Sequence, residues 1–222
     1  MVRTEKAIEE SETAKSQKYR HEIARKLLHM CSFLIVIFIY LTDKQIACIV
    51  IGTILVILFL GNTILLSSGF RFLNEFKVKY FSFLLRNNEK YGYISSNWFL
   101  LGCFLSVLLF SKEIAILAIT VLIFGDAFAA LIGMKFGKHK FKNGKSWEGT
   151  LGFIGASYLL LAGFYFAIDL TLSFAAAALI VIPITAVSEV YSKQLKIDDN
   201  LLIPLIFGVL MTGLLYAAGL IF

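Results

Sequence analysis

The chain has little charge and few of the residues that hold small secreted domains together. Charged side chains make up 16% of its 222 residues, and it has only three cysteines and two prolines. Cys31, Cys48 and Cys103 have neither metal-ligand nor disulfide-framework spacing, so we interpret them as small apolar packing residues. Because 59% of the residues are hydrophobic, this low charge excludes an ordinary soluble domain.

Most of the chain is therefore expected to lie in lipid, where only helices and closed barrels satisfy the backbone hydrogen bonds. Its apolar runs are long and lack two-residue alternation, which favours helices over barrel strands. The predicted fold class is all-α: a polytopic integral membrane protein with about seven transmembrane helices. The predicted spans are Leu27–Leu41, Ile46–Leu66, Tyr93–Phe110, Ile114–Met134, Gly149–Ile168, Leu170–Ser188 and Leu201–Phe222. The first and third are short, so six spans are the alternative if one of them enters the membrane only partway.

The basic residues predict how these spans are oriented. All Lys and Arg except Lys44 and Lys112 lie before the first span or in alternate loops. The positive-inside rule then places the N-terminus and those loops in the cytosol, which requires an odd number of spans. Topology thus accounts for the net charge of +6, and we expect no nucleic-acid partner. Residues 1–21 lack the apolar core of a signal peptide and are predicted to form a flexible cytosolic tail, and residues 22–222 a single transmembrane domain.

One carboxylate lies inside an apolar span. Asp126 interrupts Ile114–Met134 roughly two turns from the predicted cytosolic end. A charge at this depth costs about 2.5–3.5 kcal/mol on insertion scales, so it normally faces protein or a wet cavity. Gly125, Ala129 and Gly133 recur every fourth residue, which lets a helix or a ligand approach the backbone. The carboxylate is suited to hold Mg²⁺ on nucleotide phosphates, and a structural hydrogen bond between helices is the alternative.

A second cluster opens the first span. Glu22, Arg25, Lys26 and His29 have spacings of three and four residues, so they share one face of a helix. A positive-inside anchor explains the two basic residues. It does not explain the acid and the imidazole beside them, so we favour a functional role.

A third cluster is the basic loop 135–145 and the helix start after it. Ser146 is placed to cap that helix, and Gly149 is expected to leave its first turn open. A helix N-terminus beside a lysine is suited to bind phosphate. The loop is not a P-loop, because six residues separate Gly137 from Gly144 where that motif has four, and no strand precedes it.

The fourth cluster lies between the last two spans. Glu189 ends one span, and Asp198, Asp199 and Asn200 precede the next. Acidic residues favour a helix N-terminus through the macrodipole, which is the structural interpretation. On a face predicted to be basic, the same carboxylates are also suited to hold a metal or to accept a hydroxyl proton.

Taken in order, these pieces resemble the family of CTP-dependent lipid kinases, which includes dolichol kinase, phytol kinase and the CTP-using diacylglycerol kinase. The matching pieces are Glu22-x-x-Arg25-Lys26-x-x-His29, Gly125-Asp126-x-x-Ala129-x-x-x-Gly133, Lys145-Ser146-x-Glu148-Gly149, and Glu189 followed by Asp198-Asp199-Asn200 and Pro204. The resemblance implies transfer of the γ-phosphate of CTP to the hydroxyl of a membrane lipid, with Mg²⁺ or another divalent cation. It implies that Asp126 is a metal ligand or a catalytic residue.

The resemblance also assigns roles to the other residues. Glu189 or Asp199 would orient the lipid hydroxyl, and the sequence does not decide between them. The residues expected to bind the nucleotide or its phosphates are Arg25, Lys26, Gly133, Lys138, Lys145, Glu148 and Gly149. The remaining site residues, which receive no specific role, are Glu22, His29, Asp198 and Asn200.

Two other functions compete with the lipid kinase. The stretch from Asp126 to Gly149 is also similar to phosphatidate cytidylyltransferase, but the second signature of that enzyme, a Lys-Asp followed by His-Gly-Gly, is absent. A transporter is disfavoured because the polar residues gather at one face and do not trace a path across the membrane. We therefore expect a kinase with its site facing the cytosol, in the cell membrane of a prokaryote or the endoplasmic reticulum of a eukaryote. The lipid alcohol and the oligomeric state stay open.

Overall fold

The computed structural model describes residues 19–67, 71–81, 92–167 and 170–220. Within these ranges the chain is a bundle of helices with no β-strand, apart from an isolated bridge between Lys140 and Ser146. This confirms the all-α class. Residues 1–18 of the predicted flexible tail lie outside the described residues. The last three residues of that predicted tail, from Tyr19, already belong to the first helix.

Six of the described helices are long and apolar enough to cross a membrane, as expected of an integral membrane protein. They are Tyr19–Leu41, Lys44–Leu66, Lys112–Phe136, Trp147–Ala167, Leu172–Leu195 and Asp199–Ala217. The third predicted span corresponds to Ser95–Leu109, whose 15 residues extend about 22 Å against about 30 Å of hydrocarbon. Seven crossings and a cytosolic N-terminus therefore stay predictions.

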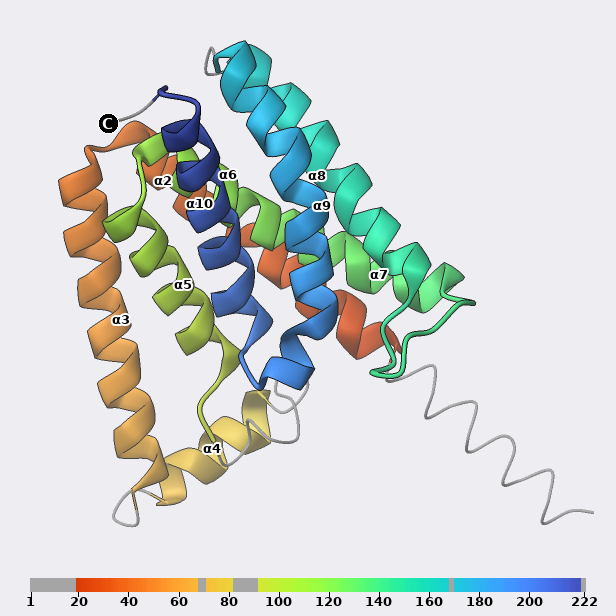
Figure 1. Ribbon diagram of the computed structural model, residues 1–222. Helices are drawn as coiled ribbons and strands as arrows, with labels where there is room; N and C mark the ends of the chain where they lie inside the picture. Colours follow the sequence, from red (N-terminus) through yellow and green to blue (C-terminus); the bar gives the residue numbers. More distant parts are fainter. Residues whose placement is uncertain (1–18, 68–70, 82–91, 168–169, 221–222) are drawn as a thin grey trace, which may run out of the picture.

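The helices pack as a bundle around one central span (Figure 1). The elements are α2 (Phe33–Leu41), α3 (Lys44–Leu66), α4 (Arg71–Phe81), α5 (Ser95–Leu109), α6 (Lys112–Thr120), the π-helix η2 (Val121–Gly125), α7 (Asp126–Phe136), α8 (Trp147–Ala167), α9 (Leu172–Leu195) and α10 (Asp199–Ala217). On one side α3 lies along α5, and on the other α8 lies along α9. Between the two pairs, α10 packs against α5, α6 and α9, and α4 lies crosswise at one end of the bundle.

The first helix begins two turns earlier than its hydropathy predicts. Residues 19–31 are helical, a turn lies at Ser32, and α2 continues to Leu41. The early turns carry the polar cluster, with an ion pair of 2.7 Å between Arg25 and Glu22. Such pairs three residues apart stabilise a helix without raising its hydropathy. The polar cluster is therefore part of the first helix and lies beside the rest of the bundle.

The central span is interrupted just before its carboxylate. From Ile114 to Ile123 the side chains are buried, and residues 121–125 form one turn of π-helix. A π-turn holds an extra residue and so changes the register of the helix beyond it. Asp126 is the first residue after this turn, and such turns are frequent at functional sites.

The start of α10 is fixed by a cap and by a close contact with α5. Asp198 caps the helix by accepting from the backbone N–H of Asn200 at 3.0 Å. Pro204 has no N–H to donate to the carbonyl of Asn200, which instead faces Gly102 of α5. A Cβ added to Gly102 would lie 2.3 Å from that oxygen. The glycine thus lets α5 approach the turn that carries Asp199.

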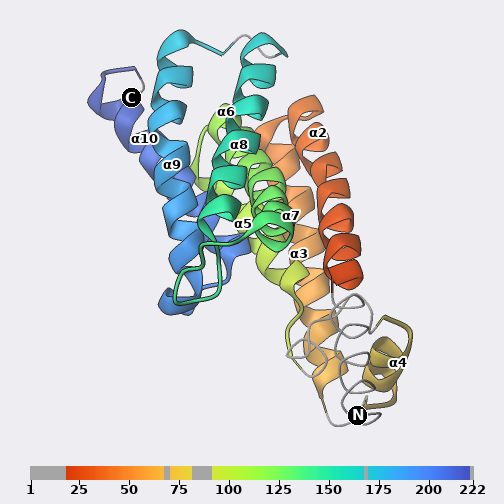
Figure 2. The ribbon, with the colours of Figure 1, turned by 90° about the vertical axis from the view of Figure 1, so that its right-hand side faces the viewer.

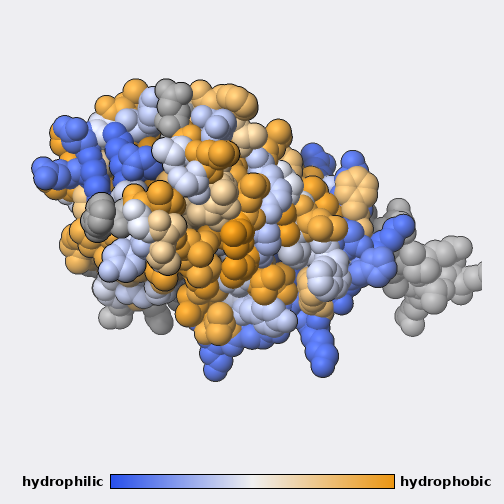
Figure 3. Space-filling view, turned by 45° about the horizontal axis from the view of Figure 1, so that its top comes forward, coloured by the Kyte–Doolittle hydropathy of each residue, from blue (hydrophilic) through white to orange (hydrophobic). Residues whose placement is uncertain are grey.

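The outer faces of the bundle are apolar, as lipid contact requires. Leu159 and Phe166 of α8 are 77% and 81% exposed. Apolar side chains cover the middle of the face seen in Figure 3, and hydrophilic ones gather toward its edges.

Candidate active site

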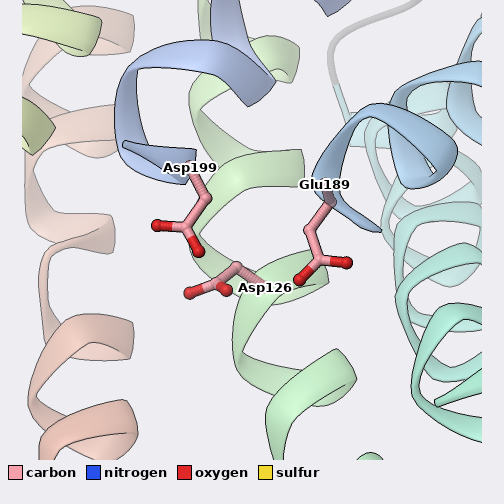
Figure 4. Close-up of side chains that lie close together, drawn as sticks. All are labelled: Asp126, Glu189 and Asp199. Carbon is pink, nitrogen blue, oxygen red and sulfur yellow. The ribbon is translucent and has the colours of Figure 1, made fainter. Parts of the chain in front are cut away.

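Three carboxylates from three different helices meet at one end of the bundle. Asp126 begins α7, Glu189 lies in the last turns of α9, and Asp199 begins α10. Figure 4 shows the three side chains pointing into a common space, and one oxygen from each lies within 4.8 Å of the others. Asp126 and Glu189 are 6% and 5% exposed. Two of the clusters in the sequence, 63 residues apart at Asp126 and Glu189, are thus brought together.

Two lysines balance these carboxylates. Lys26 of the first helix forms an ion pair with Asp126, and both side chains are only 8% exposed. Lys145 pairs with the Glu189 carboxylate, donates to the Glu189 backbone carbonyl at 2.6 Å, and lies 3.9 Å from Asp199. Buried charges are tolerated only when they are paired in this way. The five groups form a cluster of three acids and two lysines in which acids and lysines alternate.

A short loop aims Lys145 at α9. The backbone N–H of Phe141 donates to the Lys145 carbonyl at 2.8 Å, and Gly144 has a φ of 86° that favours glycine. Asn143 donates from its side-chain amide to the backbone carbonyl of Val190, and accepts from the Lys145 N–H at 3.1 Å. Asn143 was not among the predicted site residues. The Asn-Gly pair at 143–144, which is typical of tight turns, is the signal that identifies it.

The start of α8 is capped as predicted, and Gly149 both lines the candidate site and lies against α7. The Gly149 N–H donates to the Ser146 hydroxyl at 3.2 Å, which confirms the cap. We expected the glycine to leave the first turn open toward a ligand. A Cβ added there would lie 2.7 Å from the Ala129 carbonyl and 3.3 Å from the Gly133 Cα, both in α7. The absent side chain therefore also allows α7 and α8 to touch.

We expect Gly149→Ala to destabilise the protein, because its methyl group must push the α7 backbone away. Overpacking of this kind typically costs about 1–3 kcal/mol. The measurement is the apparent melting temperature of the purified protein in detergent. Gly155→Ala is the matched control in the same helix, since a Cβ there meets nothing within 4 Å. Equal melting temperatures for the two variants would contradict the close contact.

The charged cluster lines a cavity of about 750 Å³. Its lining includes Tyr19, Glu22, Lys26, Asp126, Ala129, Ala130, Gly133, Met134, Gly137, Lys140, Gly144, Lys145, Ser146, Gly149, Thr150, Glu189, Lys193 and Asp199. Lys140 and Lys193 are additions to the predicted set. Lys138 is exposed and lies outside this lining, so its phosphate-binding role rests on the sequence pattern alone.

Glu148 also lies outside the lining, and its contacts are with the loop. Its carboxylate pairs with the His139 ring at 2.7 Å and accepts from the His139 backbone N–H at 3.2 Å. These bonds brace the loop from outside. Its predicted part in nucleotide binding stays a prediction.

A second cavity of about 770 Å³ adjoins the first and shares Glu22, Lys193 and Asp199 with it. Arg25 lines this second cavity beside Trp98 and not the one that holds Asp126. The structure thus divides the polar cluster at the start of the first helix: Lys26 reaches the carboxylates, whereas Arg25 lines the neighbouring cavity.

The other predicted residues have mainly structural contacts. The His29 ring packs edge-on against Phe99 with centroids 5.0 Å apart, and its Nε2 is buried with no hydrogen-bond partner among the described residues. Asn200 donates from its side chain to Asp198 at 2.8 Å. The contacts of Asp198 and Asn200 fit the structural interpretation of a helix start.

Comparison with known proteins places the chain among a set of related sequences. An uncharacterized protein of Rickettsia prowazekii is 31% identical over 194 residues, which cover 86% of this chain and 93% of that protein. A phytol kinase of Synechocystis is 33% identical over 96 residues, and the CTP-dependent diacylglycerol kinase 1 of Saccharomyces cerevisiae is 27% identical over 134 residues. These two alignments cover 41% and 60% of the chain, but only 40% and 46% of the kinases.

No protein-family model matches the chain, and no solved structure matches it. The two kinases are therefore partial relatives, whereas the rickettsial protein aligns over nearly its full length. The chain belongs to the family of that rickettsial protein, and part of its length is related to membrane lipid kinases.

Proposed function

We propose that the protein is a kinase that transfers the γ-phosphate of CTP to the hydroxyl of a membrane lipid alcohol, such as diacylglycerol or a polyprenol, at the cytosolic face. The observation that carries this proposal is the buried cluster of three carboxylates and two lysines in one cavity. Phosphoryl transfer requires mainly positioning and charge stabilisation, and this cluster supplies both signs of charge. The partial likeness to two lipid kinases supports the same reaction class.

The carboxylates suit a divalent cation. Mg²⁺ prefers oxygen ligands at about 2.1 Å, so two ligands of one ion lie at most about 4.2 Å apart. The oxygens of Asp126, Glu189 and Asp199 lie within 4.8 Å of one another and fit this requirement after a small inward movement. We assign the cation to Asp126 and Glu189, the two most buried acids of the cluster. When bound, it would neutralise charge on the β- and γ-phosphates.

The phosphates are assigned to the basic wall of the same cavity. Lys26 and Lys145 are held by carboxylates in this structure, and nucleotide phosphates would offer them further partners. Lys140 lines the cavity from the loop. The N-terminus of α8 adds its dipole, and Gly144 keeps the turn beside it free of a side chain.

Asp199 is the best candidate for orienting the lipid hydroxyl. Its side chain is 19% exposed, against 7% for Glu189, and it lies 3.9 Å from Lys145 without a direct hydrogen bond to it. In the proposed step, the lipid oxygen bonds to the γ-phosphorus as the bond from that phosphorus to the β-phosphate oxygen breaks. The hydroxyl proton passes to the Asp199 carboxylate, and CDP leaves.

The choice of CTP rests on the name of one relative, the CTP-dependent diacylglycerol kinase. The sequence pattern also allows a phosphatidate cytidylyltransferase as the alternative function. The two named relatives are kinases, so they favour the kinase over this alternative. The cavity gives a transporter no support, since its buried charged residues gather in one cluster.

The proposal is tested by incubating the purified protein in lipid vesicles with Mg²⁺ and γ-labelled CTP or ATP. Diacylglycerol, a polyprenol and phytol are supplied separately as acceptors. We expect label in one lipid alcohol, from CTP in preference to ATP, and none when a chelator removes the cation. Absence of labelled lipid with every donor and acceptor would contradict the assignment.

A further inference from the structure

One face of α7 lines the cavity along most of its length. The residues on this face are Asp126, Ala129, Ala130, Gly133 and Met134, and Gly137, which also lines the cavity, follows directly after the helix. They recur every three or four positions, so they form a single stripe along the helix. Eleven residues of helix extend about 16 Å, which leads from the carboxylate cluster to the loop. Apart from Asp126 the stripe is apolar, and all but Met134 have a small side chain or none.

The stripe lies where the central span emerges from the bundle. Most of the span Lys112–Phe136 is buried, and Ile114–Ile123 almost completely so. Beyond Asp126 the exposure rises: Ala130 is partly exposed, and Met134 is 38% exposed. The main helical neighbour of α7 is α8, which contacts it through Gly149 and Gly152. In Figure 2, α7 lies toward the viewer with α8 on one side and the first helix on the other.

The lining of this cavity suits two different ligands. Lys140 of the loop, and Lys145, which also reaches the carboxylate cluster, suit phosphates, and the loop joins two candidate membrane spans. Along α7 the cavity is bordered by Ala130 and Met134, which have no group to pair with a phosphate. A nucleotide would therefore leave this apolar part unused. A lipid alcohol carries one hydroxyl on an apolar body. It therefore matches a cavity that is apolar along Ala130 and Met134 and charged at the carboxylate cluster.

We propose that the lipid alcohol enters the site sideways from the membrane, over Ala130 of α7, with its hydroxyl reaching the carboxylates while its chains stay in the bilayer. This inference rests on the proposed function and adds the direction from which the acceptor arrives. The small side chain at position 130 keeps the entrance open. The nucleotide enters separately, from the loop end.

A photoreactive lipid tests this route directly. The wild-type protein is placed in phosphatidylcholine vesicles with a diazirine-bearing diacylglycerol or a diazirine-bearing polyprenol, irradiated, and digested for mass spectrometry. We expect cross-links at Ala130 to Met134 of α7 that excess unlabelled lipid alcohol suppresses and added phosphatidylcholine does not. Cross-links confined to other helices, or insensitive to lipid alcohol, would overturn the route.

Ala130→Trp closes the proposed entrance, and Phe128→Trp is its matched control. Phe128 is exposed on the same helix and lies outside the cavity lining. We expect Ala130→Trp to reduce the competed cross-link at least tenfold and to raise the KM for the lipid alcohol to a similar extent. Binding of labelled CTP should change less than twofold, and the control should match wild type. An unchanged cross-link in Ala130→Trp, or an equal loss of CTP binding, would contradict lateral entry.

The outcomes separate this inference from the proposed function. Competed cross-linking at α7 without phosphorylation from any nucleotide would overturn the kinase and keep the lipid route. Phosphorylation that Ala130→Trp leaves unaffected would overturn the route and keep the kinase.

Discussion

Asp126→Asn is expected to lower the rate of lipid phosphorylation on the order of a thousandfold while the protein stays folded. The amide has nearly the shape of the carboxylate and still accepts a hydrogen bond from Lys26, which is the partner of Asp126 in the structure. It lacks the negative charge that gives a carboxylate its affinity for a divalent cation. The measurement is the initial rate of label transfer at saturating CTP, with size-exclusion elution and melting temperature as evidence of folding.

The neighbouring acids provide controls that distinguish their roles. Glu189→Gln is expected to raise the Mg²⁺ concentration needed for half-maximal activity, because Glu189 is assigned to the cation. Asp199→Asn is expected to lower kcat with little change in that concentration, because Asp199 is assigned to the hydroxyl. If folded Asp126→Asn kept more than a tenth of the wild-type rate, the phosphoryl-transfer centre would have to lie elsewhere.

Lys26→Met is expected to give the largest loss of stability. It leaves the Asp126 carboxylate buried at 6% exposure without its ion-pair partner. Breaking a buried pair in this way costs about 3–5 kcal/mol. For a chain of this size the apparent melting temperature should fall by on the order of 10 °C. Lys142→Met, at an exposed lysine in the basic loop, should leave the melting temperature unchanged.

The double variant, Lys26→Met with Asp126→Asn, distinguishes the loss of stability caused by an unpaired charge from the loss caused by altered packing. Adding Asp126→Asn to Lys26→Met removes the unpaired charge, so we expect stability to return to within about 1 kcal/mol of Asp126→Asn alone. Activity should not return, since the carboxylate is still absent. A melting temperature for Lys26→Met equal to that of wild type would mean that the pair is not a buried ion pair.

Much of the fold could be predicted because lipid restricts the choices. Long apolar runs identify helices, and the central span was placed at Ile114–Met134 against Lys112–Phe136 in the structure. Hydropathy alone placed the start of the first span at Leu27, because Arg25 and Glu22 lower the hydropathy of its first turns, whereas the spacing of the polar cluster predicted helix from Glu22 and the structure begins it at Tyr19. The π-turn before Asp126 was missed, since it depends on the packing of buried neighbours and has no signal in residue type.

The candidate site was predictable in part for a different reason. A carboxylate in lipid needs partners, and the charge pattern placed the other polar clusters on the same side as Asp126. The pairing itself was not predictable: Lys26 with Asp126, and Lys145 with Glu189, depend on how distant helices pack. The same holds for Arg25, which shares a helix turn with Lys26 and lines a different cavity.

Prolines show another limit of prediction from sequence. Pro183 cannot donate to the carbonyl of Leu179, one turn earlier in α9. That oxygen accepts instead from the Tyr158 hydroxyl of α8 at 2.8 Å. The sequence indicates that the proline leaves one backbone carbonyl without its hydrogen bond within the helix. The replacement donor comes from another helix, so only the structure identifies that donor.

The central claim is that a phosphate, and not a nucleotide, is transferred to a lipid hydroxyl at Asp126, Glu189 and Asp199. It is tested most directly by supplying CTP labelled at either the α- or the γ-phosphate, with Mg²⁺ and either a lipid alcohol or phosphatidic acid. We expect only the γ-label to enter the lipid, only with the alcohol, and CDP to be released. Transfer of the α-label to phosphatidic acid with release of pyrophosphate would contradict it and identify a cytidylyltransferase.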